Sequence, residues 1–392
     1  MMLKIASALL LACACFPATA GQALAPVEAR VPFAPAPFVG SDGFRHLAYE
    51  LHVTNFYGDT GPLRPLSLQV VADGANNPLL VRDAKALMQM VRPAPPEDAV
   101  VSIPAGKRAV FFIWITLPAH AALPRILRHR VEFETDKHVV VTLDGAAIRI
   151  DERKPMVLGS PLRGGRWLAH EGPGNMQSHH WSSLVAVNGN LTIPQRYALD
   201  LVGVDAQGHV MKPGTQDGAA SLHANWVGYG AEVIAVADGI VRSARDGEEE
   251  HRPLSPQPEP AALTADGLFG NYVVLEIGTG VFASYAHLQR GSVKMKTGDH
   301  VHRGDLLGRV GQSGNSAAPH LHFQLSNAAT FEGSEGIPYA FDHFDVFGTE
   351  TEAQLFGQGD PWKAAPVVHD RVQLPLNDVV IRFGDESRES MR

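Results

Sequence analysis

The sequence predicts an all-β protein in which an N-terminal immunoglobulin-like β-sandwich precedes a small antiparallel β domain. Two features support this fold class. Short runs rich in β-branched and aromatic residues recur along most of the chain, and turn-forming residues separate them. Apolar residues at helical spacing are nearly absent, which argues against an α-helical or α/β fold.

Length and charge narrow the class of protein. The chain has 392 residues, enough for two or three domains, and its hydrophobic fraction of 45% suffices for ordinary cores. Its formal net charge of -8 argues against a nucleic-acid partner, because such proteins usually present a basic face. No feature of the sequence indicates an oligomeric state.

Residues 1–20 have the features of a secretory signal peptide. A lysine precedes an apolar run over 5–16, and Ala18-Thr19-Ala20 fits a cleavage site after Ala20. The run is too short to span a bilayer, and no later segment is long and apolar enough to do so. We therefore expect an exported protein, periplasmic or extracellular, with no integral membrane segment in the mature chain.

Both cysteines of the chain, Cys13 and Cys15, lie in this N-terminal segment. Because Leu10-Leu11-Ala12 precedes Cys13, a lipoprotein anchor at Cys13 is the alternative to cleavage after Ala20. With cleavage after Ala20, the mature protein has neither disulfides nor thiolate metal ligands.

Residues 21–150 form the predicted sandwich. A Pro- and Ala-rich lead-in over 21–41 precedes short β-rich runs that turn residues separate, as in antiparallel sandwiches. No cluster of ligand-type residues stands out in this unit, so we expect a structural or targeting role. The expected strands are 47–56, 66–72, 98–106, 108–117 and 129–134.

Residues 151–348 form the second predicted unit, and 349–392 are expected to be a C-terminal tail without a clear signal. An acidic, Pro-rich stretch over 245–267 indicates an exposed loop insertion. The expected β segments are 183–187, 190–202, 230–244, 270–278, 280–288, 292–311 and 319–325.

Two histidines lie two positions apart in the last of these segments, 319-PHLHFQL-325. Side chains alternate along a strand, so His320 and His322 point to one face. The pair by itself also fits two hydrogen-bonded histidines on a half-exposed strand. A zinc hydrolase needs more: three protein ligands, an open position for water, a base, and a group that stabilises the oxyanion.

Six linked motifs supply the context that the histidine pair lacks. They are 197-YALD-200, 230-GAEVIAVADGIV-241, 270-GNYVVLE-276, 285-YAHL-288, 297-TGDHVHRGDLLGRVG-311 and 312-QSGNSAAPHLHF-323. With these motifs in this order, the sequence resembles the lysostaphin-type, or LytM-like, zinc metallopeptidase family over roughly 180–330. The resemblance implies that the second unit is a small antiparallel β metallopeptidase domain with one Zn²⁺, which cleaves peptide cross-links of bacterial cell walls.

The resemblance also implies roles for individual residues. Asp200 matches the carboxylate ligand and His322 a histidine ligand of the metal. His320 and His287 match the two catalytic histidines that do not bind the metal. By this analogy His320 is the base, and His287 orients or stabilises the tetrahedral intermediate.

The sequence departs from the family at one ligand. The family usually has H-x-x-x-D, but Arg196 stands four residues before Asp200, and arginine stays protonated and does not bind zinc. Upstream, 178-SHHWSSLVAVNGNLTIPQRYALD-200 suggests a hairpin with Asn188-Gly189 as its turn. A two-residue turn brings His179 to the face of Asp200, and a three-residue loop brings His180 there.

Similarity to variant family members with a QR-x-A-x-D pattern favours His180 as the third ligand, with His179 as the alternative. Arg196 is then expected beside the site, where it would bind a substrate carboxylate or the oxyanion. Asn315 precedes the histidine pair and is expected to line the groove.

These features predict an exported zinc-dependent endopeptidase that hydrolyses peptidoglycan stem peptides or their cross-links. Two alternatives stay open. One is a catalytically inactive, metal-free cell-wall-binding or regulatory module on the same fold, which Arg196 supports. The other is a zinc peptidase acting on a secreted protein, which the acidic net charge allows.

Overall fold

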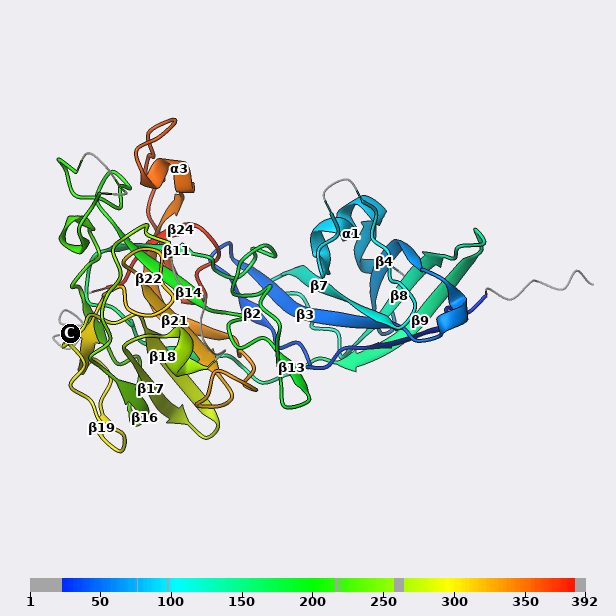
Figure 1. The fold of residues 1–392 in the computed structure, drawn as a ribbon, viewed down its shortest axis with the longest axis horizontal. Coiled ribbons are helices and arrows are strands. Elements are labelled where there is room, and N and C mark those ends of the chain that lie inside the picture. The colour runs from blue at the N-terminus through cyan, green and yellow to red at the C-terminus, as the bar shows by residue number, and fades with distance from the viewer. Residues whose placement is uncertain are drawn as a thin grey trace, which may run out of the picture.

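The computed structural model describes residues 23–384 except 76, 97–98, 216–217, 219 and 257–263. The expected signal peptide, with Cys13 and Cys15, lies outside the described residues. The chain forms an elongated molecule, with a β-sandwich (blue to teal) at one end and a second β unit (green to red) at the other (Figure 1). The all-β prediction is confirmed. Helices in the described part are short: α1 Ala84–Met90, α2 Ala265–Leu268, α3 Glu352–Leu355, and 3-10 turns at Gly58–Thr60 and His223–Asn225.

None of these helices has the length and apolar character needed to cross a membrane.

The N-terminal unit is a sandwich of two antiparallel sheets, as the sequence predicts. Apolar residues of both sheets meet in one core, which includes Leu47, Leu68, Phe111 and Phe133. The five-stranded sheet contains β1 Val27–Arg30, β2 Phe38–Val39, β3 Phe44–Asn55, β6 Val91–Arg92 and β7 Lys107–Pro118. The four-stranded sheet contains β4 Arg64–Ala72, β5 Pro78–Asp83, β8 Ile126–Glu134 and β9 Val140–Arg149.

The sheet that contains β3 and β7 is covered on both faces. Leu47 and Tyr49 of β3 pack in the sandwich core. Ala48, between them, joins a different core that the second unit also builds. Because side chains alternate along a strand, each face of the sheet belongs to a different core. Two-sided burial explains the nearly continuous apolar run of β7, which a sheet with one solvated face would not show.

The second unit is built on a sheet of 11 strands, in which every pairing except β10 with β22 is antiparallel. Smaller hairpin-like pairs are β12 Val185–Val187 with β13 Asn190–Thr192, and β15 Glu232–Ile234 with β20 Leu306–Arg309. The large sheet contains β10 Met156–Leu158, β11 Arg166–His170, β14 Leu199–Val204, β16 Gly239–Arg245, β17 Tyr272–Gly278, β18 Val281–Ala286, β19 His300–Val301, β21 Leu321–Ser326, β22 Tyr339–Thr349, β23 Val368–Gln373 and β24 Val379–Arg382.

The segment after 349 takes part in this sheet. β24 lies between β22 and β11, and β23 pairs with β22. Val380 and Ile381 of β24 are fully buried. The uneven composition of this segment hid both strands, because each is short and four of the six residues of β23 are polar.

Two expected elements differ from the structure. The run 98–106 forms no strand among its described residues, where only an isolated bridge joins Ile103 to Leu63; Pro104 has no N–H to donate to a ladder. The hairpin turn at Asn188-Gly189 is confirmed, with φ of 47° and 81° at the two residues. Its ladder ends at the Val185–Thr192 pair, so the extrapolated pairing of 179 with 198 is absent.

Candidate metal centre

Asp200 and His322 form the base of the site because their strands are neighbours. β14 pairs with β21 in a register that places Asp200 directly opposite His322. Residues opposite each other in an antiparallel pair have side chains close together on one face. His322 Nδ1 accordingly lies 3.0 Å from Asp200 Oδ1. Both side chains are almost fully buried.

The two remaining histidines of the family motifs approach from adjacent chain segments. His320 precedes β21 and places Nε2 3.3 Å from Asp200 Oδ1, so His320 and His322 do share a face. His287 follows β18 with a φ of 62°, a conformation unusual for a residue with a side chain and often found at functional sites. The ring centroids of His287 and His320 are 4.8 Å apart.

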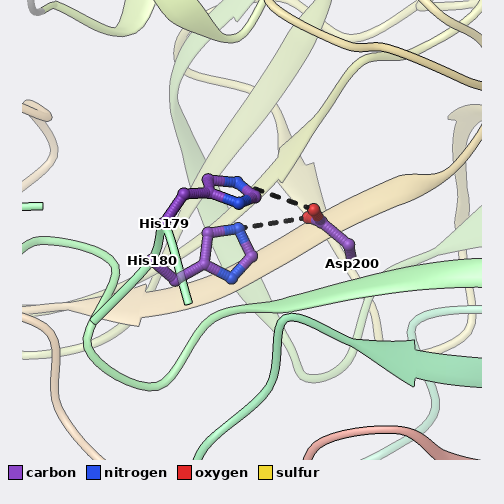
Figure 2. A group of neighbouring side chains, drawn as sticks. All are labelled: His179, His180 and Asp200. Carbon is purple, nitrogen blue, oxygen red and sulfur yellow. Dashed lines mark ion pairs between the residues drawn. The ribbon is translucent and has the colours of Figure 1, made fainter. Parts of the chain in front are cut away.

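The His179-His180 pair reaches Asp200 from the loop after β11 (Figure 2). His180 Nε2 lies 3.3 Å from Asp200 Oδ1, and His179 Nε2 lies 3.8 Å from Asp200 Oδ2. The three residues offer ligand atoms within 4.8 Å of one another, a spacing that fits one metal ion. The side chain of His180 is 1% exposed and that of His179 is 62% exposed, so the two imidazoles are not equivalent.

The hydrogen bonds behind the rings assign their tautomers. His180 Nδ1 lies 3.0 Å from the Glu171 carbonyl oxygen, and His320 Nδ1 lies 2.8 Å from that of Ala318. A carbonyl oxygen can only accept a hydrogen bond, so the Nδ1 atoms carry the protons and Nε2 of both rings carries a lone pair. In His322 the two nitrogens exchange these roles. Its Nε2 carries the proton and lies 2.9 Å from Gln324 Oε1, while its Nδ1 carries the lone pair and faces Asp200.

Three imidazole lone pairs therefore converge on one buried carboxylate. His180 Nε2 is buried and makes no hydrogen bond of acceptable geometry, although Asp200 is close. Lone pairs facing a carboxylate repel it, unless a cation lies among them. Histidines whose far nitrogen donates to a carbonyl or amide oxygen are the usual arrangement of metal ligands. The residues thus fit a divalent ion that prefers nitrogen and oxygen donors, such as Zn²⁺.

The charges of the site agree with this assignment. Burial alone would raise the pKa of Asp200; positive charge among the rings of His320 and His180 lowers it well below its usual range, and with neutral rings a bound cation would supply that charge. Burial lowers the pKa of His180 to about 4 and that of His287 well below the usual value. Burial also lowers the pKa of His179, but its hydrogen bond to Glu171 and the negative charges of Asp200 and Glu171 together raise that pKa overall. At neutral pH the site thus holds an ionised Asp200 with neutral His180 and His287.

The prediction that Arg196 binds substrate is contradicted by its contacts. Arg196 is buried and forms ion pairs with Glu50 of β3 and Glu335, to which its Nε also donates over 2.8 Å. Burial would lower the pKa of Arg196, but these two carboxylates raise it overall. A cation with two buried partners is not available to a substrate carboxylate.

Asn315 does line the groove above the site, as expected. The groove has a volume of about 600 Å³, and all its lining residues fall between His170 and Phe356. Among the described residues, no part of the sandwich therefore covers it. Leu355 and Phe356, in and directly after α3, form part of one wall, although their segment was set aside as a tail.

Sequence reasoning missed the residues that orient the site. Glu171 and Gln324 hold the rings of His180 and His322, and His170, opposite Asp200 on β11, lines the groove. The carbonyl of Glu171 has no sequence signature, since every residue has one. Gln324 offered a signal: it lies two positions after His322 and thus on the same face of β21.

Comparison with known proteins matches residues 226–332 to Peptidase family M23. The matched segment contains His287, Asn315, His320 and His322. It begins downstream of Asp200, His179 and His180, so the carboxylate and the third histidine come from outside it. No curated protein is significantly similar to the chain.

Several solved structures share a distant likeness. A mutant catalytic domain of the prophage-encoded M23 protein EnpA from Enterococcus faecalis is 18% identical, with 44% of this chain and 85% of that one covered and a TM-score of 0.23. The catalytic domain of lysostaphin from Staphylococcus simulans is 21% identical, with 41% and 79% covered and a TM-score of 0.21. Csd3 from Helicobacter pylori is 12% identical, with 77% and 73% covered and a TM-score of 0.22. The family match over 226–332 supports a peptidase-type function for this chain.

Proposed function

We propose that the protein is a zinc-dependent endopeptidase. The observation that carries this proposal is the convergence of three unprotonated imidazole nitrogens, from His180, His320 and His322, on the buried carboxylate of Asp200. The match of 226–332 to a peptidase family supports the same reaction class.

We assign His180, Asp200 and His322 as the metal ligands. His180 is preferred to His179 because its Nε2 is buried without a hydrogen bond, whereas His179 is largely exposed and its Nδ1 lies 3.3 Å from Glu171 Oε2. Glu171 and Gln324 orient the first and last of these ligands by accepting from the far nitrogens of the rings. Such partners hold the ring angle and increase the basicity of the nitrogen that binds the ion.

The remaining histidines divide the proton chemistry. Bound zinc would act as a Lewis acid that polarises the scissile carbonyl and lowers the pKa of water to about 7. The Ala318 carbonyl holds the proton of His320 on Nδ1, so Nε2 is free to take the proton of the attacking water. His287 donates Nδ1–H to the Ser313 carbonyl over 2.8 Å, which directs its other nitrogen away from that carbonyl. Its Nε2 then carries a lone pair beside His320, so we propose that His287 orients the tetrahedral intermediate by accepting a hydrogen bond from it.

We further propose that the substrate is a peptidoglycan stem peptide or cross-link, and that the protein is exported to reach it. The resemblance to lysostaphin-type peptidases supports the substrate class, and the signal-peptide features of residues 1–20 support export. The metal-free binding module loses its main support, because Arg196 pairs with Glu50 and Glu335 while His180 faces Asp200.

The test combines metal analysis with hydrolysis. The chain from Gly21 onward is purified, its zinc content measured, and the protein incubated with purified peptidoglycan, whose released fragments are analysed by mass spectrometry. We expect one zinc per chain and fragments with new peptide termini, both lost in His322→Ala. In His320→Gln we expect zinc to stay and hydrolysis to fall by about 100-fold or more. A zinc-free protein that binds peptidoglycan without cleaving it would establish the metal-free binding module instead. Cleavage restricted to protein substrates would establish a zinc peptidase that acts on a secreted protein.

A further inference from the structure

The loop that carries His180 is not held by the sheet. Among the described residues, 171–184 form turns and irregular backbone without a strand. Within the second unit, the Glu171 carbonyl accepts from Ser178 Oγ over 2.7 Å and from His180 Nδ1 over 3.0 Å. These contacts set the ring of His180, but both come from the near end of the same loop. Asn377, which precedes β24, also donates to the Pro173 carbonyl over 3.0 Å, but this contact too lies near the start of the loop, before the histidine pair.

Trp181, the residue after His180, is anchored in the sandwich. Its indole N–H donates to Glu50 Oε1 of β3 over 2.7 Å. Its ring lies 5.7 Å from the ring of Phe112 and 5.7 Å from that of Trp114, both on β7. The side chain is 1% exposed. A buried aromatic ring with a satisfied polar group fixes both the place and the orientation of the backbone that carries it.

The start of the loop is held by the sandwich as well. Arg92 of β6 donates from Nη2 to the Met176 carbonyl and to Gln177 Oε1, both over 3.0 Å. Gln177 Nε2 in turn donates to the carbonyl of Gln89 in α1 over 2.9 Å. Contacts with the sandwich thus flank the histidine pair on both sides.

Arg196 links Glu50, which holds Trp181, to the segment that leads into β14, the strand of Asp200. Glu50 accepts from both Trp181 and Arg196, and Arg196 also pairs with Glu335. Glu335 accepts the backbone N–H of Ile193 over 2.9 Å, on the approach to β14. A buried charge without its partner is strongly unfavourable, so the members of this network hold one another in place.

We propose that the N-terminal sandwich is a working part of the metal site: Glu50, through Trp181 and Arg196, positions the loop that presents His180 to Asp200. Glu50, Trp181 and Arg196 are positioning residues, since none of them touches the ion or the substrate. This inference rests on the proposed function, and it replaces the expected substrate contact of Arg196 with a structural link between the two units.

The test measures zinc affinity of the full chain from Gly21, by competition with a chromogenic chelator, in Glu50→Gln and Trp181→Phe. Trp181→Phe keeps an aromatic ring against β7 but removes the N–H donor together with part of the ring system, so it remains informative if Glu50→Gln does not fold. We expect a zinc dissociation constant about 10- to 100-fold higher in both variants, as is typical when the groups that orient metal ligands are lost. The visible spectrum of the cobalt-loaded protein should also change, because it reports the geometry of the ligands.

Two controls separate positioning from general destabilisation. Leu68→Ala lies in the sandwich core on β4 and lowers stability without touching the network. Glu132→Gln on β8 removes a sandwich carboxylate outside the network. Both should leave the dissociation constant within about twofold. If Glu50→Gln and Trp181→Phe bind zinc as tightly as the wild type, or if Leu68→Ala weakens binding equally, the inference is wrong while the proposed function stands. If the wild type binds no zinc, the proposed function fails first.

Discussion

At the residue scale, burial separates two adjacent histidines that the sequence leaves equivalent. His179 and His180 both reach the carboxylate of Asp200. His180 is enclosed, with its Nδ1 bonded to a carbonyl and its Nε2 without a hydrogen bond. His179 is exposed and directs Nδ1 towards Glu171. An enclosed lone pair without a partner is costly unless an ion binds it, so the difference predicts which histidine is the ligand.

We therefore expect His180→Ala to lose stoichiometric zinc and His179→Ala to keep it. The measurement is metal content after dialysis against a weak chelator, with folding of each variant checked by circular dichroism. His179→Ala is the matched control, because it removes the same ring from the neighbouring position. Full occupancy in both single variants and in the double variant would contradict the assignment of a ligand to this pair.

His129 gives the sandwich a pH-dependent stability. Its Nδ1 bonds to the Ala146 carbonyl and its Nε2 to the Tyr49 hydroxyl, each over 2.9 Å, so the neutral ring has both nitrogens satisfied. Burial lowers the pKa of His129 to about 4. The unfolded chain binds this proton near pH 6.5, and the folded chain does so only near pH 4. Stability is therefore complete above the unfolded pKa and falls as the pH drops towards the folded one.

The expected loss from this residue is about 2 kcal/mol of unfolding free energy between about pH 7 and about pH 5. Urea unfolding at the two pH values, in the wild type and in His129→Gln, measures it. The variant should be less stable at neutral pH and lose less stability on acidification. An unchanged pH slope in His129→Gln would show that His129 is not the group that titrates.

At the scale of elements, a strand's place in the sheet matters more than its place in the chain. β24 comes from the last described residues, yet it pairs with β11, which in turn pairs with β14 and its Asp200. β23 lies on the far side of β22, off the path to the site. The two strands differ accordingly: Ile381 of β24 is fully buried and Val368 of β23 is 54% exposed.

This difference predicts unequal effects of the same kind of truncation. Ile381→Ala should lower the free energy of unfolding by about 2–5 kcal/mol, because it leaves a cavity between packed strands. Val368→Ala should change it by less than about 0.5 kcal/mol, as is usual for exposed positions. Denaturant unfolding of the two variants provides the comparison. Equal, small effects would mean that the segment after 349 is a loosely attached tail after all.

At the scale of the whole molecule, one sheet of the sandwich belongs to two cores. Phe111 and Phe112 are neighbours on β7, but Phe111 packs in the sandwich core and Phe112 packs in the core shared with the second unit. The sandwich is therefore joined to the second unit by buried apolar contacts as well as by the pairing of Arg196 with Glu50. Such contacts make the two units unfold and function together.

The two phenylalanines provide a matched test. Each change to alanine should lower stability by about 3–5 kcal/mol. Only Phe112→Ala should also weaken zinc binding, since Trp181 rests against that ring. Calorimetry and chelator competition on both variants measure the two effects. The interpretation fails if Phe111→Ala and Phe112→Ala weaken zinc binding to the same extent.

The sequence by itself determined the parts of the protein that depend on local patterns. Alternation along the strands gave the all-β class, and the spacing of His320 and His322 placed them on one face. The Asn188-Gly189 turn followed from residues that tolerate positive φ. Motifs in sequential order also named Asp200 and His287, which the structure brings to the same place.

Only the tertiary structure decided which of the adjacent histidines is enclosed, where β24 lies, and what Arg196 contacts. Glu50 and Arg196 are 146 positions apart, and Glu335 lies another 139 positions from Arg196. No periodicity or spacing encodes such pairs, because they arise from two units closing on each other. A buried charge needs a partner of opposite charge close by. Arg196, which the sequence suggested as a substrate contact, therefore forms internal ion pairs instead.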